Sequence, residues 1–343
     1  MSKAMKTVAA DHAQRRDEMH KKFAELGLKG YWQNQRETHR VEPRLWRWED
    51  VQPALLEASQ VIRLGEEAFR RNVSLITESR TVIMGFQIVL PGEAAPAHRH
   101  TNTALRFVVQ GGGAYTTSNG EPMVMEVGDL LIQPNFVWHD HVNTSSEPII
   151  WIDALDVGVV NFLDCYPFRE NWTDGEQQPL TRTQGASRRL YGPIRKPVVE
   201  YEGAGVPYHY KWGETLGALE ELAASGDCDP YDGVLLEYKN PLSGGHTFLT
   251  MTCHIQMLLP GQETLSHRHT GTTHYHVVQG EGVTTVGRKE PVDFVWDKND
   301  SFTLPPWRWH RYRNRSKTEP VILFSVTDIP MLEMTGLHRE ERG

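Results

Sequence analysis

Two histidines in the stretch APAHRHTNTALRFVVQG, residues 95–111, have the spacing of metal ligands. The stretch has the pattern of a β-strand, so the side chains of His98 and His100 leave the backbone on one face and that of Arg99 on the other. Two neutral imidazoles side by side are good ligands for a borderline divalent metal ion. A carboxylate usually accompanies a histidine pair at non-haem iron, yet the stretch contains no Asp or Glu. We therefore expect a metal site to which the protein supplies no carboxylate.

The same pattern occurs twice in the chain. The segment PGEAAPAHRHTNTALRFVVQGGG aligns with PGQETLSHRHTGTTHYHVVQGEG at an offset of 169 residues (267 − 98). Farther along, GDLLIQPNFVWHDHVN aligns with NDSFTLPPWRWHRYRN at an offset of 171 residues (310 − 139) and adds a third histidine to each copy. A nearly constant offset indicates an internal duplication. The matched histidines are His98, His100 and His139 in the first copy and His267, His269 and His310 in the second.

Short β-strands must position these histidines. The runs 81–90, 105–110, 122–127 and 129–134 alternate or are β-branched, and Gly, Pro or Asn separates them. Closely spaced short strands favour a sandwich or small barrel over βαβ units. Helical patterns occur over residues 8–26 and, as a short amphipathic helix, over 214–226. We expect an all-β fold with helical flanks.

The composition excludes several functional classes. The formal net charge of −8 and the lack of a long basic run argue against a nucleic-acid partner. No apolar run reaches the length of about 18 residues that a membrane span needs, and the first residues lack the apolar segment of a secretory signal. Cys165, Cys228 and Cys253 lie far apart, as reduced structural thiols do, so we expect a cytoplasmic protein.

The ligand stretches resemble the two motifs of the cupin superfamily. Ala104, and Thr273 in the second copy, stand where the family usually has a glutamate, and Phe136 stands where it usually has a glycine. The resemblance implies a bicupin with two double-stranded β-helix (jelly-roll) barrels. The implied domains are an N-terminal helical arm (1–79), a catalytic barrel (80–165), a connector with a short helix (166–245), a second barrel (246–330) and a C-terminal tail (331–343). The matching motif residues are Gly92, His98, His100 and Gly111, then Gly128, Pro134, His139 and Asn143.

The missing carboxylate bears on the substrate. Three neutral ligands leave a divalent ion with its full charge of about +2, which favours a chelating anionic substrate that brings its own oxygen donors. Such a substrate occupies two of three open positions and leaves the third for O2. This arrangement favours Fe(II) as the cofactor, because a redox-inert ion such as Zn(II) has no one-electron step with O2.

A longer resemblance, to the gentisate 1,2-dioxygenase family, covers most of the chain. It includes PGEAAPAHRHTNTALRFVVQG (residues 91–111), WHDH, WIDALDV and RVEPRLWRWEDVQPALLEA. The resemblance implies an Fe(II)-dependent enzyme that uses O2 to open the ring of a small aromatic hydroxy-acid between its carboxyl-bearing and hydroxyl-bearing carbons. Gentisate is the leading substrate, and salicylate, 5-substituted salicylates and 1-hydroxy-2-naphthoate are the alternatives. Pocket residues such as Met84 and Gly85 are expected to decide between them, and the family favours a homotetramer.

Four further residues of the first copy are candidates for catalysis. By the resemblance, Arg106 grips the substrate carboxylate, a task that suits a bidentate guanidinium. His141 follows His139 by two residues, so it shares the interior face and can exchange protons near the metal. Asp153 is expected to orient one of these imidazoles, and Gln87 to donate to a substrate oxygen.

The second copy keeps the three histidines, so a second metal site is an option, but it changes the other positions. Aligned by offset, Tyr275 replaces Arg106, Tyr312 replaces His141 and Phe324 replaces Asp153, while Gln256 keeps the type of Gln87. Without a cationic clamp, the second barrel is not expected to run the same reaction. Two other functions remain open: a metal-dependent cupin isomerase or decarboxylase, which usually keeps the glutamate, and a non-catalytic bicupin, which commonly loses ligand histidines.

Overall fold

The computed structural model describes residues 3–29, 41–164, 169–195 and 205–343. The chain divides into two units, Met1–Arg40 and Val41–Gly343. In the first unit, helix α1 (Lys3–Glu25) covers the helix predicted over residues 8–26 almost to its end and begins earlier. Gly27 follows it at φ 67°, a left-handed conformation that commonly ends helices. Among the described residues, no helix is long and apolar enough to cross a membrane.

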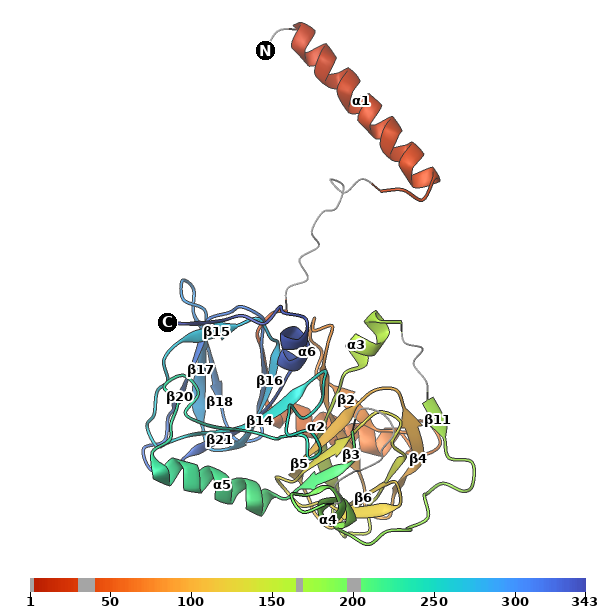
Figure 1. The fold of residues 1–343 in the computed structure, drawn as a ribbon, viewed down its shortest axis with the longest axis vertical. Helices are drawn as coiled ribbons and strands as arrows, with labels where there is room; N and C mark the ends of the chain where they lie inside the picture. Colours follow the sequence, from red (N-terminus) through yellow and green to blue (C-terminus); the bar gives the residue numbers. More distant parts are fainter. Residues whose placement is uncertain (1–2, 30–40, 165–168, 196–204) are drawn as a thin grey trace. The chain divides into compact units, whose positions relative to one another are not determined.

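The second unit contains the two predicted barrels, each built from one six-stranded and one five-stranded antiparallel sheet (Figure 1). The sheets of the first barrel have the orders β12-β8-β5-β10-β3-β2 and β11-β4-β9-β6-β7. Its strands are β2 (Asn72–Ser74), β3 (Ile83–Val89), β4 (Ala94–His100), β5 (Ala104–Gln110), β6 (Tyr115–Ser118), β7 (Glu121–Val124), β8 (Leu130–Gln133), β9 (His139–Val142), β10 (Ile149–Leu155), β11 (Arg169–Asn171) and β12 (Tyr208–Tyr210).

The second barrel repeats this plan with the orders β1-β19-β16-β21-β14-β13 and β18-β17-β20-β15-β22. Its strands are β1 (Arg44–Trp46), β13 (Val234–Glu237), β14 (Thr252–Leu258), β15 (His267–His269), β16 (Thr273–Gln279), β17 (Gly282–Val286), β18 (Val292–Trp296), β19 (Ser301–Leu304), β20 (His310–Asn314), β21 (Val321–Thr327) and β22 (Glu340–Arg342). The remaining helices are α2 (Trp48–Val61), α3 (Val157–Phe162), α4 (Ala186–Tyr191), α5 (Trp212–Ser225) and α6 (Ile329–Met334).

Short strands from outside the two predicted barrels complete each of them. Strand β1, from the arm expected to be helical, pairs with β19 of the second barrel, whereas β12, from the connector, pairs with β8 of the first. Strand β2 joins β3, β13 joins β14, and β22 of the C-terminal tail joins β15. The arm, the connector and the tail are therefore partly β-structure. Strands of three or four residues are too short to show a period of two, so the sequence did not indicate them.

Two helices of 14 residues, α2 and α5, follow the exchanged strands. The backbone N–H of Trp48 donates to Asp300 Oδ1 (2.8 Å), and that of Trp212 donates to Asp129 Oδ1 (2.9 Å). A carboxylate at a helix N-terminus satisfies free N–H groups and complements the helix dipole. Helix α2 packs on β3 and α5 on β13 and β14, so each helix begins at one barrel and packs on the other. The duplicated unit thus includes a strand and a helix ahead of each barrel. The helix predicted over 214–226 is α5, whereas α2 was not predicted.

The two barrels share one hydrophobic core. It combines Phe86, Phe107 and Ile152 of the first barrel with Ile255 and Phe324 of the second. The rings of Phe107 and Phe324 stack with centroids 4.2 Å apart. Met84 also belongs to this core. Because side chains alternate along β3, the expectation that Met84 shapes the substrate pocket is wrong: it lies on the opposite face from Gly85 and Gln87.

Two buried aspartates link the barrels with matching hydrogen bonds. Asp156 accepts from the backbone N–H of Thr103 in its own barrel and from Thr250 Oγ1 in the other, both at 2.8 Å. In the second barrel, Asp328 accepts from the backbone N–H of Thr272 at 2.9 Å and from the hydroxyl of Thr81, across the interface, at 2.7 Å. The barrels are therefore held in one relative position by a repeated polar contact as well as by apolar packing.

The cysteines form no disulfide among the described residues. Cys228 and Cys253 are free thiols, as expected, and Cys165 lies outside the residues that the structure describes.

Removing the ring of Phe324 tests how much the packing between the barrels contributes to the free energy of unfolding. We expect Phe324→Ala to lower the free energy of unfolding by about 3–5 kcal/mol, because it opens a cavity in a buried core. Urea denaturation followed by circular dichroism measures the change. Phe162→Ala is the matched control, because that ring is 84% exposed and its loss should change little. Equal effects of the two variants would contradict a shared core.

Candidate metal centre and substrate pocket

The three histidines of the first copy converge. Strand β4 carries His98 and His100, β9 carries His139, and the pairing of these strands places His98 opposite His139. One ring nitrogen from each histidine lies within 4.8 Å of those of the other two. Ring centroids are 4.4 Å apart for His98 and His139 and 5.0 Å apart for His100 and His139. This part of the sequence prediction agrees with the geometry.

Backbone carbonyls set the tautomer of two of these histidines. Nδ1 of His100 lies 2.8 Å from the carbonyl oxygen of Asn102, and Nδ1 of His139 lies 3.0 Å from that of Val137. A carbonyl only accepts, so Nδ1 carries the hydrogen and the Nε2 lone pair is left for a metal. Burial lowers the pKa of His100 to about 4, with the same direction for His139, so both rings are neutral. These residues fit a borderline divalent ion.

A left-handed turn between β8 and β9 is hydrogen-bonded to the end of β4. Phe136 has φ 62°, and its backbone N–H donates to the carbonyl oxygen of His100 (2.8 Å). The second copy repeats the turn with Trp307 at φ 60°, donating to the carbonyl oxygen of His269 (2.7 Å). This conformation explains why related motifs favour glycine here, since a side chain costs roughly 1–2 kcal/mol.

Arg106 and Asp153 form a buried pair beside the triad. They lie opposite each other on β5 and β10, with Nε and Oδ1 3.6 Å apart. Burial raises the pKa of the Asp153 carboxyl, against the effect of Arg106, and lowers that of the guanidinium. Asn72 Nδ2 and Trp151 Nε1 donate to the two carboxylate oxygens at 2.9 and 3.0 Å. Asp153 therefore orients the arginine, and its described contacts do not include the imidazole that we expected it to hold.

Several buried polar atoms beside the triad lack a hydrogen-bond partner. They are Nε of Arg106, Nε2 of Gln87 and Nε2 of His141, none of which has a hydrogen-bond partner among the described residues. The other nitrogen of His141, Nδ1, lies 2.8 Å from Thr116 Oγ1. Buried polar groups are nearly always satisfied, so three orphaned atoms in one barrel are groups that a polar ligand would satisfy. The sequence prediction named all three residues.

Arg70 is a site residue that the sequence prediction missed. Its Nη2 lies 2.7 Å from His98 Nδ1, and its Nη1 donates to the carbonyl oxygens of Phe69 (2.7 Å) and Pro96 (3.0 Å). Burial, followed by the charges of Arg106 and Arg169, lowers the pKa of this guanidinium to about 9. An arginine in the loop before β2 has no sequence signal that separates it from a surface charge. With Arg106, it makes this barrel cationic around the triad.

The second triad has nearly the same geometry. His267 and His310 lie opposite each other on β15 and β20, and one nitrogen of each of His267, His269 and His310 lies within 4.8 Å of the others. The ring centroids of His267 and His310 are 4.3 Å apart, and those of His269 and His310 are 5.3 Å apart. Nδ1 of His310 lies 3.0 Å from the carbonyl oxygen of Arg308, which again leaves Nε2 for a metal.

The positions around the second triad differ in kind from those around the first. Tyr275 and Tyr312 replace Arg106 and His141, and their hydroxyls bond to each other at 2.7 Å. The expectation that Phe324 is the counterpart of Asp153 is wrong. Strand β21 places Ser325 opposite Tyr275, as β10 places Asp153 opposite Arg106. The second copy therefore contains one more residue between its last two strands, β20 and β21. Phe324 instead lies in the core between the barrels.

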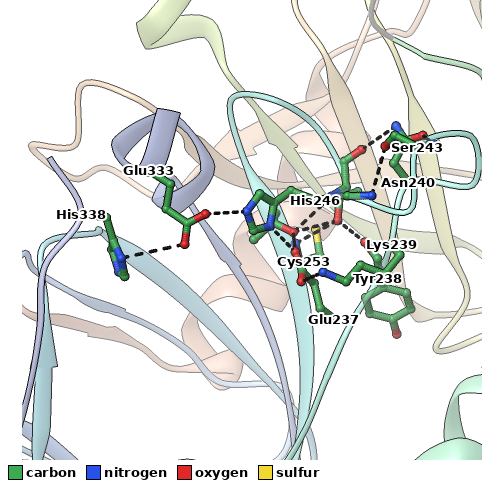
Figure 2. Close-up of polar contacts among 12 residues, drawn as sticks. Glu237, Tyr238, Lys239, Asn240, Ser243, His246, Cys253, Glu333 and His338 are labelled. Carbon is green, nitrogen blue, oxygen red and sulfur yellow. Dashed lines mark hydrogen bonds and ion pairs between the residues drawn. The ribbon is translucent and has the colours of Figure 1, made fainter. Parts of the chain in front are cut away.

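A cavity of about 390 Å³ lies at the second triad. His246 is held beside it by two carboxylates, with Nδ1 2.5 Å from Glu237 Oε1 and Nε2 2.8 Å from Glu333 Oε2 (Figure 2). Both carboxylates accept, so both ring nitrogens carry hydrogen and the ring is charged. Partial burial opposes this charge, but the two hydrogen bonds outweigh it and raise the pKa of His246. The contact ties the loop before β14 to helix α6.

Comparison with known proteins gives relatives of one kind. A family model described as "Cupin domain" matches residues 85–157 and 254–327. The chain is 37% identical over 313 residues to a gentisate 1,2-dioxygenase of Aquipseudomonas alcaligenes, covering 88% of this chain and 87% of that protein. It is 34% identical to the 5-aminosalicylate 1,2-dioxygenase of a Comamonas species, covering 95% and 90%. The crystal structure of salicylate 1,2-dioxygenase from Pseudoaminobacter salicylatoxidans, with gentisate, matches with a TM-score of 0.85 at 26% identity, covering 96% and 94%.

The contact of His246 predicts a measurable titration. A pKa raised by folding adds stability that is complete below the ordinary value of about 6.5 and is lost as the pH rises through the folded value. Proton NMR of the ring should therefore give a pKa above the ordinary one. Glu333→Gln should lower it, because one of the two accepting charges is lost, whereas Glu319→Gln on the exposed loop before β21 should not. A pKa at or below the ordinary value in the unaltered protein would contradict the doubly bonded ring.

Proposed function

Because this chain belongs to the gentisate 1,2-dioxygenase family of bicupins, we propose that its first barrel holds Fe(II) and opens gentisate between the carboxyl-bearing and hydroxyl-bearing carbons. The chain is a ring-cleaving dioxygenase, as its relatives are. The observation that carries the choice of barrel is the buried Arg106, whose Nε is unpartnered among the described residues beside the histidine triad. The second barrel has a triad, but Tyr275 stands at the position that corresponds to Arg106.

The histidines His98, His100 and His139 would hold the iron. When bound, the metal supplies a redox-active Lewis acid to which O2 and the substrate oxygens can both bind. The protein contributes no carboxylate, so the site keeps its positive charge for a substrate that brings a carboxylate and an adjacent hydroxyl. Family membership and the retained ligand set both oppose a non-catalytic bicupin.

Arg106 is placed to bind the substrate carboxylate. Its charge is only partly compensated, because Asp153 also accepts from Asn72 and Trp151 and sits 3.6 Å away rather than in a close bidentate pair. A substrate carboxylate at Nε would satisfy a buried donor and add a charge-assisted hydrogen bond. Arg70, which lies against His98, adds a second cation that favours an anion in this barrel.

His141 and Gln87 would act on the substrate hydroxyl side. Nε2 of His141 is unpartnered among the described residues and its Nδ1 is held by Thr116, so Nε2 can hydrogen-bond a substrate oxygen and exchange its proton. The unpartnered Nε2 of Gln87 is a donor only and would fix a substrate oxygen without changing its protonation. Both contacts would position the substrate ring, and only the contact with His141 would also transfer a proton.

Salicylate and its 5-substituted forms are the alternative substrates, followed by 1-hydroxy-2-naphthoate. One relative acts, by its name, on 5-aminosalicylate, and a solved salicylate 1,2-dioxygenase has been studied with gentisate. In this chain Gly85 faces the same side as Gln87, and a Cβ there would approach Asn72 Oδ1 to 2.6 Å. Asn72 thus takes up the space at Gly85 and is a second candidate for substrate selection. Action as a homotetramer in the cytoplasm belongs to the same proposal.

Oxygen uptake tests the substrate directly. Protein purified without oxygen and loaded with Fe(II) should consume one O2 per gentisate, and gentisate should give the highest kcat/KM in a panel with salicylate, 5-aminosalicylate and 1-hydroxy-2-naphthoate. A higher kcat/KM for a salicylate would select the alternative. If a metal-replete sample consumed no O2 with any of these 2-hydroxy acids, the proposed reaction would be refuted.

Replacing Arg106 tests the carboxylate clamp. Arg106→Gln should raise KM for gentisate by at least about tenfold, because a charge-assisted hydrogen bond is lost, and Arg106→Lys should lose less because it keeps the charge. Steady-state oxygen consumption gives both constants. Arg311→Gln is the control, since Arg311 pairs with Glu263 on the surface of the other barrel. An unchanged KM in a folded Arg106→Gln protein would place the substrate elsewhere.

A further inference from the structure

We propose that the second triad is a metal site in its own right, which binds a divalent cation without any organic ligand and more tightly than the first triad does. The two ligand sets are equal in number and type. What differs is the charge around them, which has opposite sign in the two barrels.

Cations surround the first triad. Nη2 of Arg70 lies 2.7 Å from His98 Nδ1, and Arg106 is buried on β5 beside the triad. Asp153 compensates in part, with its Oδ1 3.6 Å from Arg106 Nε. A divalent ion placed among the three histidines would be repelled by the remaining positive charge of these arginines. The first barrel therefore has a low intrinsic affinity for a metal ion alone.

The contact of Arg70 with His98 adds a second obstacle. Nδ1 of His98 lies 2.7 Å from Arg70 Nη2 and 3.4 Å from the carbonyl oxygen of Pro96. A guanidinium has donors only, so the shorter contact requires Nδ1 to accept and leaves the hydrogen of the ring on Nε2. A protonated Nε2 cannot bind a metal. Either this hydrogen bond breaks or the ring turns before His98 becomes a ligand. Metal binding at the first triad thus displaces an existing interaction.

Carboxylates surround the second triad. Oδ1 of Asp232 lies 3.7 Å from His267 Nε2, in the loop before β13, whereas Arg70 lies in the corresponding loop before β2. Among the described residues that line the cavity, the cations that we expect are Arg342 and His246, and each contacts a glutamate. The acidic residues that line it are Asp229, Asp232, Glu237, Glu333 and Glu340. This surplus of negative charge attracts a divalent cation.

Unpartnered buried groups show that this cavity is built for a ligand. Nδ1 of His267, Nε2 of His310 and Oγ1 of Thr273 have no hydrogen-bond partner within the described part of the chain. These residues are 4%, 2% and 3% exposed, respectively. The orphaned Nε2 of His310, whose Nδ1 faces the carbonyl oxygen of Arg308, is an atom that a metal ion would satisfy, and no donor among the described residues contacts it as Arg70 contacts His98.

The same charges exclude the anionic substrates of the first barrel. The hydroxyls of Tyr275 and Tyr312 bond to each other, so neither offers the charge of Arg106. A hydroxybenzoate carboxylate here would face Asp232 without a cationic clamp. The second site is therefore a site for the cation and neutral ligands such as water. At the first site, by contrast, an anionic substrate and the metal should each raise the affinity of the other. This last point rests on the proposed function.

Single-site variants measure the two affinities separately. In protein with its metal removed, His310→Ala leaves the first triad and His139→Ala leaves the second. Co(II) is the probe, followed by its visible absorption and by competition with a chelator, without organic ligand. We expect one equivalent in each variant and a Kd at least about tenfold lower in His139→Ala. Equal affinities, or tighter binding in His310→Ala, would overturn the proposal. Circular dichroism checks that each variant is folded. If either variant fails to fold, titration of the unaltered chain with Co(II), which should show two phases, replaces the measurement on the variants.

Asp232→Asn identifies the cause. In the otherwise unaltered chain it should weaken the tighter Co(II) site by about tenfold and leave the weaker site as it is. Asp293→Asn, on the exposed strand β18 outside the cavity, is the matched control. An unchanged Co(II) affinity in Asp232→Asn would show that the charge of Asp232 does not cause the tighter binding. Added gentisate should tighten Co(II) binding in His310→Ala but not in His139→Ala. If only this effect of gentisate were missing, the result would contradict the proposed substrate but not the proposal that the second triad binds the metal more tightly.

Discussion

The register between two antiparallel strands is the constraint on which the site depends. Pairing of β4 with β9 sets His98 opposite His139, and the alternation of side chains along β4 then adds His100 on the same face. A slip of one residue would turn every one of these side chains to the other face. The left-handed turn at Phe136, between β8 and β9, donates its N–H to the carbonyl of His100 at the end of β4 and holds this register. The second barrel repeats the pairing and the turn, and its triad has nearly the same dimensions.

Equal histidine triads in unequal surroundings are the basis on which we propose that only one half of the duplicated fold carries out the reaction. In the first barrel, Arg106 with an unpartnered Nε gives the triad a place for an anion. In the second, two tyrosine hydroxyls close on each other and carboxylates line the cavity. The barrels are nevertheless not independent, because α2 and α5 each begin at one and pack on the other, and because Asp156 and Asp328 bond across the interface. The two barrels are therefore joined by a shared core and by hydrogen bonds across it.

The sequence predicted which histidines converge in each barrel, because the repeated motif shows both their types and their spacing. It also predicted Arg106, Gln87 and His141 as neighbours of the triad. Residues whose role comes from three-dimensional contacts were missed or misplaced. Arg70 reaches His98 from a loop, Asp153 holds an arginine rather than an imidazole, and a shift of one residue hid Ser325 as its counterpart. The exchanged strands β1 and β12 were missed because three residues carry no periodic signal.

The location of the substrate is the central claim, and a crystal structure of the metal-loaded protein soaked with gentisate in the absence of oxygen tests it most directly. We expect gentisate in the first barrel, with its carboxylate on Arg106 and its carboxylate and adjacent hydroxyl facing the metal held by His98, His100 and His139. The second barrel should hold metal without gentisate. Gentisate bound in the second barrel, or with its carboxylate away from Arg106, would contradict the account.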